Sequence, residues 1–256
     1  MRALTFNIRH GVGLDGVHDL ERVARVIEGA AADLVALQEV DRHLSPRSGY
    51  LDQAGWLAQR LDMDMAYGPV VDLEPPASPP APTAAWTAGP AARRQYGIAL
   101  LSRTALHEPR NLLLTRPRGG EQRGLLGAAV HMDGRAVRVF CTHLQHRSRT
   151  ERLAQATQIA ESLVSGAGPV VVMGDLNARP GEPEIAPLTE VLDDAWAVAG
   201  HGDGFTFDAA TPHARIDYIL TSADLVARSA AVLRTDASDH LAVLADLELD
   251  ALGSGG

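Results

Sequence analysis

The sequence predicts one domain of the α/β or α+β class, rich in short buried strands and containing a few helices. Strand, helix and strand patterns follow one another within the first forty residues, as they do in a crossover unit. Short apolar runs bounded by Gly, Pro or polar residues then recur along the chain. No segment separates two halves that look complete alone, so we expect a single domain over residues 1–250.

The first unit illustrates the pattern. Residues 2–8 are apolar and strand-like until Asn7 interrupts them. Residues 20–31 place apolar side chains at helical spacing, and Asp19 stands where it can cap the helix. Residues 33–40 form a second buried strand that ends on polar side chains.

The same criteria predict the remaining elements. Further helices are expected at 50–61, where the pattern is weaker, and at 149–164. Further strands are expected at 96–102, 111–115, 124–131, 136–142, 170–173, 215–220, 226–233 and 241–249.

Three stretches lack these patterns. The composition shifts to Pro, Ala and Thr after Glu74, which predicts a long loop insertion over residues 74–94. Its Trp86 and the following arginines either contact substrate or belong to a solvated, mobile loop. The chain past Pro187 is expected to be loop-rich as far as residue 214, and the Gly-rich residues 251–256 should form a flexible tail.

Composition limits the class of protein. The chain has 256 residues, of which 46% are hydrophobic, enough for one large core. Its formal charge of −9 argues mildly against non-specific nucleic-acid binding, which depends on basic surface. The single cysteine, Cys141, lies in an apolar run and is expected to be a buried thiol, so neither an internal disulfide nor a cysteine-based zinc site is expected.

Location and assembly are predicted from the same data. No apolar run approaches the roughly 18 residues of a membrane span. The strand pattern begins at Arg2, which leaves no room for a signal peptide. We therefore expect a soluble, cytoplasmic monomer.

The segment Val170–Pro180 is the most informative motif. A buried apolar run is broken by Gly174, and Asp175 and Asn177 follow two residues apart, so extended backbone points both to one side. A carboxylate and an amide at a strand end suit the binding of a metal, a water or a phosphate oxygen. The alternative is a polar turn capped by Asn and Pro.

Similar polar residues stand at other strand ends. Taken singly, each has an ordinary alternative, such as a turn residue, a surface carboxylate or a core histidine. Asp217 is harder to explain in this way, because a carboxylate inside an apolar strand is unfavourable unless it is paired. His240 is a natural partner. The whole set is Asn7, Glu39, His143, Asp175, Asn177, Asp217, Asp239 and His240.

These residues lie in motifs that resemble the endonuclease/exonuclease/phosphatase superfamily of metal-dependent phosphoesterases, specifically its compact bacterial metal-dependent hydrolase branch. Seven motifs occur in the family's order. They are Phe6-Asn7-Ile8, Leu37-Gln38-Glu39-Val40, Gly97 through Ser102, Thr142-His143-Leu144, Gly174-Asp175-Leu176-Asn177, Arg215-Ile216-Asp217-Tyr218-Ile219 and Ser238-Asp239-His240. The resemblance implies a four-layered, deoxyribonuclease-like sandwich of two mixed β-sheets flanked by helices.

The resemblance also implies roles for single residues. Glu39 would be the principal metal ligand, with Asn7 and Asp239 beside it. Asp175 would orient or deprotonate the attacking water, and Asn177 would hold a phosphate oxygen. An oxygen-rich set without thiolates suits Mg²⁺ or Mn²⁺.

The remaining implied residues belong to the catalytic and substrate-binding groups. His143 occupies the position of a catalytic histidine, and Asp217 with His240 would form a carboxylate–histidine pair. Whether Asp175 or His240 is the general base stays open. Arg123 is a candidate phosphate contact, and an ordinary surface arginine is the competing interpretation.

The implied activity is hydrolysis of a phosphoester by an activated water. We expect a phosphatase or phosphodiesterase for a small-molecule or lipid-head-group phosphoester, because the chain is acidic and has no basic runs. A nuclease for DNA or RNA is the alternative. An inactive binding module is a distant third, because no expected catalytic or metal-binding residue is missing.

Overall fold

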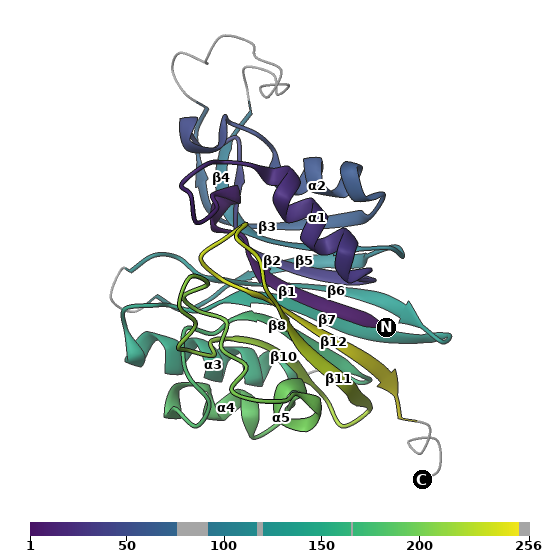
Figure 1. The fold of residues 1–256 in the computed structure, drawn as a ribbon. Coiled ribbons are helices and arrows are strands. Elements are labelled where there is room, and N and C mark those ends of the chain that lie inside the picture. Colours follow the sequence, from purple (N-terminus) through teal and green to yellow (C-terminus); the bar gives the residue numbers. More distant parts are fainter. Residues whose placement is uncertain (76–91, 117–119, 165, 251–256) are drawn as a thin grey trace.

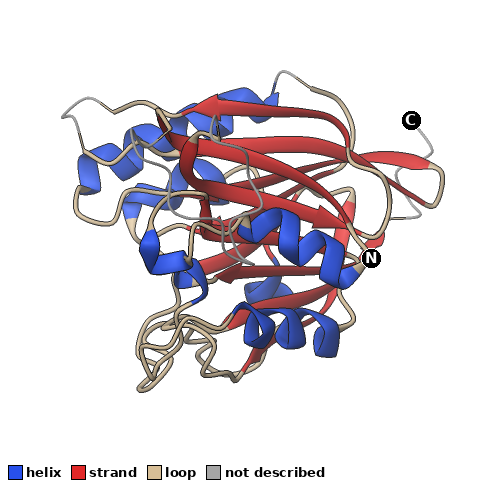
Figure 2. Cartoon of the chain, turned by 90° about the horizontal axis from the view of Figure 1, so that it is seen from above, coloured by secondary structure: helices blue, strands red, loops and turns tan. Residues whose placement is uncertain are grey.

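The computed structural model describes residues 1–75, 92–116, 120–164 and 166–250, which form four layers (Figures 1 and 2). Two six-stranded sheets pack against each other. The first contains, in spatial order, β11 (Leu225–Leu233), β12 (Ala242–Leu249), β1 (Arg2–Asn7), β2 (Leu34–Arg42), β4 (Arg94–Ser102) and β3 (Asp64–Leu73). The second contains β5 (His107–Leu113), β6 (Gly124–Met132), β7 (Arg135–His143), β8 (Val170–Asp175), β10 (Asp217–Thr221) and β9 (Asp193–Asp194).

Helices form the two outer layers. Helices α1 (Leu20–Ala30) and α2 (Gln53–Leu61) cover the first sheet, and α3 (Arg149–Val164) with the short α4 (Ala186–Thr189) covers the second. The remaining short helices are α5 (Ala195–Ala199), η1 (Arg9–Gly11), η2 (Pro46–Ser48) and η3 (Pro183–Ile185). Both sheets are mixed, so the predicted fold class and layered architecture are confirmed.

Each sheet contains one parallel pair joined by a helix. Strands β1 and β2 flank α1 in the chain, and β7 and β8 flank α3. In register, Asn7 lies beside Gln38, and His143 lies beside Asp175. Because parallel strands end at the same edge of a sheet, this arrangement brings the polar ends of all four strands to one end of the sandwich.

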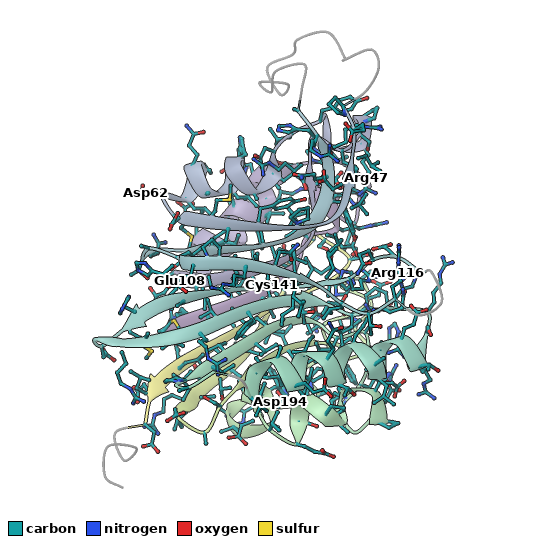
Figure 3. All side chains as sticks on the ribbon, turned by 180° about the vertical axis from the view of Figure 1, so that it is seen from behind. Arg47, Asp62, Glu108, Arg116, Cys141 and Asp194 are labelled. Carbon is teal, nitrogen blue, oxygen red and sulfur yellow. The ribbon has the colours of Figure 1, made fainter. Side chains whose placement is uncertain are left out.

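The inner core layer joins the two sheets. It takes residues from both ends of the chain, including Ala3 and Leu247, together with Cys141. Cys141 lies in the middle of the molecule (Figure 3), fully buried as expected, and burial raises the pKa of its thiol to about 12. Such a thiol stays protonated and packs as a small apolar side chain.

Helix α1 forms where the sequence predicts it. Its apolar positions are buried, and the Asp19 carboxylate accepts a hydrogen bond from the Glu21 backbone N–H. The helix ends at Ala30, and Ala31 takes a left-handed conformation instead of extending it. Helix α3 likewise spans the predicted residues.

Several predicted boundaries are wrong. Strand β3 was not expected, because Gly68 and Pro69 interrupt its apolar pattern and acidic residues stand near both ends. Strand β5 lies at 107–113 and not at 111–115. None of its residues is buried, so its sequence lacks the alternation of apolar and polar residues that marks a strand. The predicted loop past Pro187 contains α4, β9 and α5, all too short to produce a pattern.

Two predicted segments lie partly or wholly outside the described residues. Of the insertion at 74–94, residues 76–91 are not described, so Trp86 is not placed; Arg94 already belongs to β4. The predicted tail at 251–256 is outside as well. Among the described residues, no helix is long and apolar enough to span a membrane.

Candidate active site

The end of the second sheet supplies three adjacent polar side chains. His143 is the last residue of β7, Asp175 is the last of β8, and Asp217 is the first of β10. The pairing registers place His143 and Asp217 on either side of Asp175. All three are buried, so their charges interact strongly.

Glu39 reaches the same place from the first sheet. It does not end β2 as expected, because the strand continues to Arg42 and Glu39 lies in a bulge between Leu37 and Val40. Its left-handed backbone (φ 58°) accompanies this irregularity. The amide of Asn7 links the two sheets: its Nδ2 donates to Glu39 Oε1 at 3.2 Å and to Asp175 Oδ2 at 3.1 Å.

Asp217 and His240 form the predicted hydrogen-bonded pair. His240 Nδ1 lies 3.0 Å from Asp217 Oδ2, and both side chains are buried. Burial alone would lower the pKa of His240, but the carboxylates of Asp217 and Asp175 outweigh it and raise that pKa to about 10. His240 is therefore an imidazolium at neutral pH in this environment.

Asp175 is the meeting point of these groups. Its Oδ1 accepts the backbone N–H of Asn177 at 2.9 Å, and its Oδ2 lies 3.4 Å from His143 Nε2 and 3.8 Å from His240 Nε2. Burial, followed by the negative charge of Asp217, raises the pKa of Asp175 to about 7. A carboxyl group with that pKa can exchange a proton near neutral pH.

His143 has the opposite charge preference to His240. Arg123 Nη1 donates to His143 Nδ1 at 3.0 Å, so a neutral His143 carries its hydrogen on Nε2, facing Asp175. Burial and then the positive charge of Arg123 hold the pKa of His143 well below its usual range. Arg123 itself is only 3% exposed, so the interpretation as an ordinary surface arginine is wrong.

The other predicted residues complete this end of the molecule. Asn177 has left-handed backbone (φ 50°), and its Nδ2 donates to the Leu144 carbonyl at 3.0 Å. Asp239 is partly exposed and lies 3.5 Å from Arg9 Nε. The loop carrying Asp239 is fixed by Ser238, whose hydroxyl donates to the Asn7 carbonyl at 2.7 Å.

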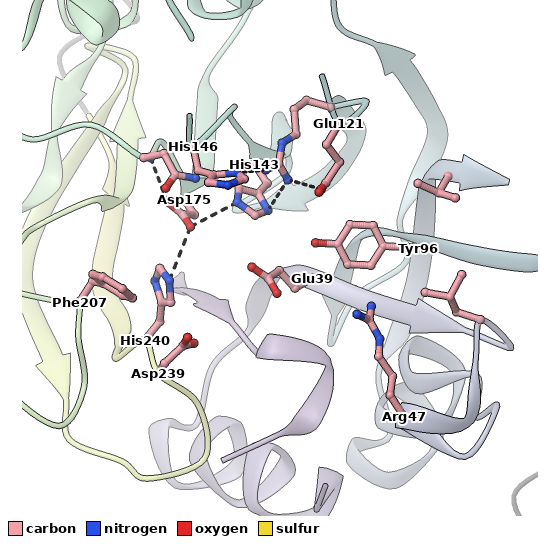
Figure 4. A pocket seen from close by; sticks show the side chains of 14 residues that line it. Glu39, Arg47, Tyr96, Glu121, His143, His146, Asp175, Phe207, Asp239 and His240 are labelled. Atoms are coloured by element: carbon pink, nitrogen blue, oxygen red, sulfur yellow. Dashed lines mark hydrogen bonds and ion pairs between the residues drawn. The ribbon is translucent and has the colours of Figure 1, made fainter. Parts of the chain in front are cut away.

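These groups open into a cavity of about 490 Å³ (Figure 4). Glu39, Asp175, Asp239 and the two catalytic-candidate histidines line it, whereas Asn7 and Asp217 lie behind them. Sequence reasoning missed the seven other lining residues, which are Leu44, Arg47, Val71, Tyr96, Glu121, His146 and Phe207.

One signal in the sequence pointed to Arg47. Asp41 stands in a buried strand and needs a positively charged partner, which is the argument that paired Asp217 with His240. In the structure Arg47 supplies that partner.

Comparison with known proteins agrees with this geometry. A sequence profile of the Endonuclease/Exonuclease/phosphatase family matches residues 4–240. The chain belongs to this family. No curated protein matched the sequence in a separate search.

Solved structures share this fold. An endonuclease/exonuclease/phosphatase from Beutenbergia cavernae DSM 12333 is 26% identical, with a TM-score of 0.79 over 97% of this chain and 71% of that one. The Bacteroides thetaiotaomicron mannosyl-6-phosphatase Bt3783 is 18% identical, with a TM-score of 0.75 over 97% and 100%. The human Nocturnin catalytic domain is 24% identical, with a TM-score of 0.69 over 98% and 94%.

Enzymes of this family hydrolyse phosphoesters and generally use divalent metals, and the residues of this chain fit such an ion. Glu39 is half-buried and makes no ion pair within the described part of the chain, and burial raises its pKa. A carboxylate in that state gains from a nearby cation. Asp175, Asp217 and His240 also each offer a ligand atom within 4.8 Å of the others.

Proposed function

We propose that this protein is an Mg²⁺- or Mn²⁺-dependent phosphoester hydrolase that acts on a small-molecule or lipid-head-group phosphoester. One observation carries the proposal. Two buried histidines with opposite charge preferences flank a single carboxylate, Asp175, beside the half-buried Glu39. This combination supplies a proton acceptor, two N–H donors and a cation-binding carboxylate within one cavity.

The metal would be held by Glu39 and Asp239, with Asn7 beside them. When bound, it neutralises charge on the phosphoryl oxygens. Asn7 donates to Glu39, which fixes the orientation of that carboxylate. The backbone N–H of Arg9 donates to Asn7 Oδ1 at 3.1 Å and thereby orients the amide.

Asp175 orients the attacking water and accepts its proton. Its raised pKa places proton uptake near neutral pH, and the Asn7 amide and the Asn177 backbone N–H hold the carboxylate in position. His240, which is charged at neutral pH, donates to the phosphoryl group through Nε2. Its Nδ1 stays on Asp217, which keeps the ring oriented.

The remaining groups bind the phosphate. Neutral His143 presents its Nε2–H to a phosphoryl oxygen, and Asn177 contributes its side-chain amide. Arg123 is the proposed arginine contact, since its guanidinium lines the cavity beside His143.

A small substrate is favoured by the size of the site and by charge. The cavity of about 490 Å³ suits a single small molecule, and the chain carries a net charge of −9. A mannosyl-6-phosphatase is among the proteins that share this fold.

The test is a hydrolysis screen with Mg²⁺ and Mn²⁺ on phosphomonoesters, phosphodiesters, sphingomyelin, inositol phosphates and plasmid DNA. We expect turnover of a small phosphoester that EDTA abolishes and added metal restores. Full activity in EDTA would exclude the metal-dependent mechanism. Efficient cutting of plasmid DNA, with poor turnover of every small ester, would establish the nuclease alternative instead.

A further inference from the structure

The cavity has a second wall that the proposed chemistry does not use. Arg47, Tyr96 and Glu121 line the side facing Asp175 and the histidines, and Figure 4 places the Arg47 guanidinium and the Tyr96 hydroxyl toward the centre. These three residues, the distal wall, are where the alcohol part of a phosphoester would lie once its phosphate is beside Glu39 and Asp175.

Arg47 is held rigidly in this wall. Asp41, whose side chain is fully buried, accepts from Arg47 Nε at 2.9 Å and from Nη2 at 2.6 Å. Ser48 donates to the same carboxylate at 2.8 Å. The guanidinium also lies over the Tyr96 ring, 5.7 Å from its centroid. Two N–H groups of Arg47 bind Asp41, and no described residue accepts from the remaining three, which can therefore donate to a ligand.

Tyr96 and Glu121 add complementary groups. Within the described residues, the Tyr96 hydroxyl makes no hydrogen bond, and it points into the cavity. Glu121 is 40% exposed and uses Oε1 to pair with Arg123 at 2.9 Å. The wall therefore offers N–H donors, a hydroxyl and a carboxylate acceptor side by side.

The distal wall holds little uncompensated positive charge. Both arginines that line the cavity are paired with carboxylates, Arg47 with Asp41 and Arg123 with Glu121. Arg147 contacts His146 from a neighbouring hollow and does not line this cavity. The sequence contains no lysine. Among the described residues, no unpaired cation lines this wall, so a second anionic group on the substrate would meet Glu121 without one to offset the repulsion.

Hydroxyl groups match this wall better than anions do. A hydroxyl can accept from Arg47 or Tyr96 and donate to Glu121, whereas a phosphate or carboxylate can only accept. We propose that the distal wall binds an uncharged, hydroxylated alcohol group, so that the enzyme selects sugar or polyol phosphates bearing a single phosphate. This inference rests on the proposed phosphoesterase function and specifies its substrate class.

The first test compares matched substrates on the wild-type enzyme with Mg²⁺. A hexose 6-phosphate, the corresponding hexose 1,6-bisphosphate and p-nitrophenyl phosphate differ in the second charge or in the hydroxyls. We expect kcat/KM for the monophosphate to exceed that for the bisphosphate by at least about tenfold, and to exceed that for p-nitrophenyl phosphate as well.

The second test uses variants of the distal wall. Tyr96→Phe keeps the ring beneath Arg47 and removes the hydroxyl, so the ratio of kcat/KM for hexose phosphate to that for p-nitrophenyl phosphate should fall about tenfold, mostly through KM. Glu121→Gln removes the negative charge, so the ratio of kcat/KM for the hexose 6-phosphate to that for the bisphosphate should fall by a similar factor. Tyr67→Phe is the matched control, because its hydroxyl binds the Val40 carbonyl outside the cavity; both ratios should be unchanged.

The outcomes separate this inference from the function on which it rests. Hydrolysis of p-nitrophenyl phosphate without preference for the hexose phosphate, or with preference for the bisphosphate, would overturn the distal-wall proposal alone. An unchanged ratio in a Tyr96→Phe variant with wild-type thermal stability would do the same. If no phosphoester of either kind were hydrolysed with Mg²⁺ or Mn²⁺, the proposed function itself would be wrong.

Discussion

His143 and His240 lie in equally buried positions, yet their charge preferences are opposite. Burial lowers the pKa of both imidazoles, so their partners decide the outcome. His143 faces the guanidinium of Arg123, which reinforces the effect of burial. His240 faces two carboxylates, which reverse it. Single substitutions of these partners should therefore change the pH dependence of activity in a defined direction.

The variant Asp217→Asn tests how the carboxylate partner of His240 sets the pH dependence of activity. The variant retains a hydrogen-bond acceptor but removes a negative charge that raises the pKa of His240. With burial less opposed, that pKa should fall from about 10 by one unit or more. Because the proposed mechanism needs protonated His240, the alkaline limb of the kcat/KM profile should move to lower pH by the same amount.

A matched variant and the acidic limb of the kcat/KM profile supply the controls for this prediction. Asp203→Asn, at an exposed position away from the cavity, should leave the profile in place. If Asp217→Asn moved the acidic limb instead, His240 would act as the general base, and Asp175 would only orient the water.

Glu39→Gln tests the metal site. The variant should weaken Mg²⁺ binding and lower kcat/KM by roughly three orders of magnitude or more, since a charged ligand is lost. In metal-free protein at neutral pH it should unfold at the same temperature or higher. A carboxylate whose pKa is raised by burial opposes folding once the pH exceeds its ordinary pKa.

Calorimetric Mg²⁺ titration, steady-state kinetics and thermal unfolding measure these three effects. Glu190→Gln, at an exposed position after α4, is the control and should match the wild type. Unchanged Mg²⁺ affinity in Glu39→Gln would assign the metal to other ligands, with Asp175, Asp217 and His240 the next candidates.

At the scale of elements, the position of Asp175 depends on the close approach of β8 to β7. Gly174 precedes Asp175 with φ 155°, and a Cβ atom there would overlap the backbone carbonyl of Thr142. Only glycine allows the two strands to pair at this point. The glycine thus sets the distance between His143 and Asp175 at the strand ends.

Gly174→Ala should therefore lower the free energy of unfolding by about 2–4 kcal/mol and reduce turnover in the protein that remains folded. Gly29→Ala is the counterpart, because Gly29 lies inside α1 with no atom near the added methyl. It should raise the free energy of unfolding by about 0.5–1 kcal/mol, as alanine favours helix. Urea unfolding of both variants measures the difference; equal stability of Gly174→Ala and wild type would contradict the account.

The sequence predicted those elements in which buried apolar residues form a continuous run or recur at a regular spacing. Helix α1 has a continuous apolar stripe, and β8 is buried along its whole length. Strand β5 has no buried position, and β3 contains Gly-Pro, so neither gave a signal. These two lie at the edges of their sheets, where pairing on one side alone defines the strand.

The sequence predicted those site residues whose charged or polar side chains stand within apolar segments. Asp217 inside an apolar strand required a partner, and His240 lies 3.0 Å away. Tyr96 and Glu121 could not be found in this way. A tyrosine within a strand is common in proteins, and so is an acidic residue that precedes a strand. Their importance appears only when the sheets bring them to one cavity.

At the scale of the whole molecule, the two sheets share one core layer. Because that layer includes Ala3 from β1 and Leu247 from β12 as well as β7 and β8, we infer that residues 1–250 fold as one domain. The site lies where the sheets' ends meet, so its geometry depends on their packing. Loosening the core between the sheets would separate Glu39 from Asp175 even with every site residue present.

The charge of the whole chain predicts the salt dependence of binding. A net charge of −9, with both cavity arginines already paired, provides no extended basic surface in the described residues. A ligand that makes six to ten phosphate contacts would lose about 10³–10⁵ in affinity between roughly 50 and 200 mM salt, whereas one or two contacts give a shallow slope. KM for the best substrate should therefore change by less than about tenfold over this range.

Arg123→Ala should raise KM more than it lowers kcat if Arg123 binds the phosphate in the ground state. Because Arg123 also donates to His143, Arg123→Lys should be measured beside Arg123→Ala. The lysine variant keeps the positive charge but loses the two planar N–H donors that bind His143 and His146. Steady-state kinetics at several salt concentrations decide the matter. A steep salt slope together with efficient cutting of plasmid DNA would reject the small-substrate proposal, since one cavity with paired arginines cannot neutralise many backbone phosphates.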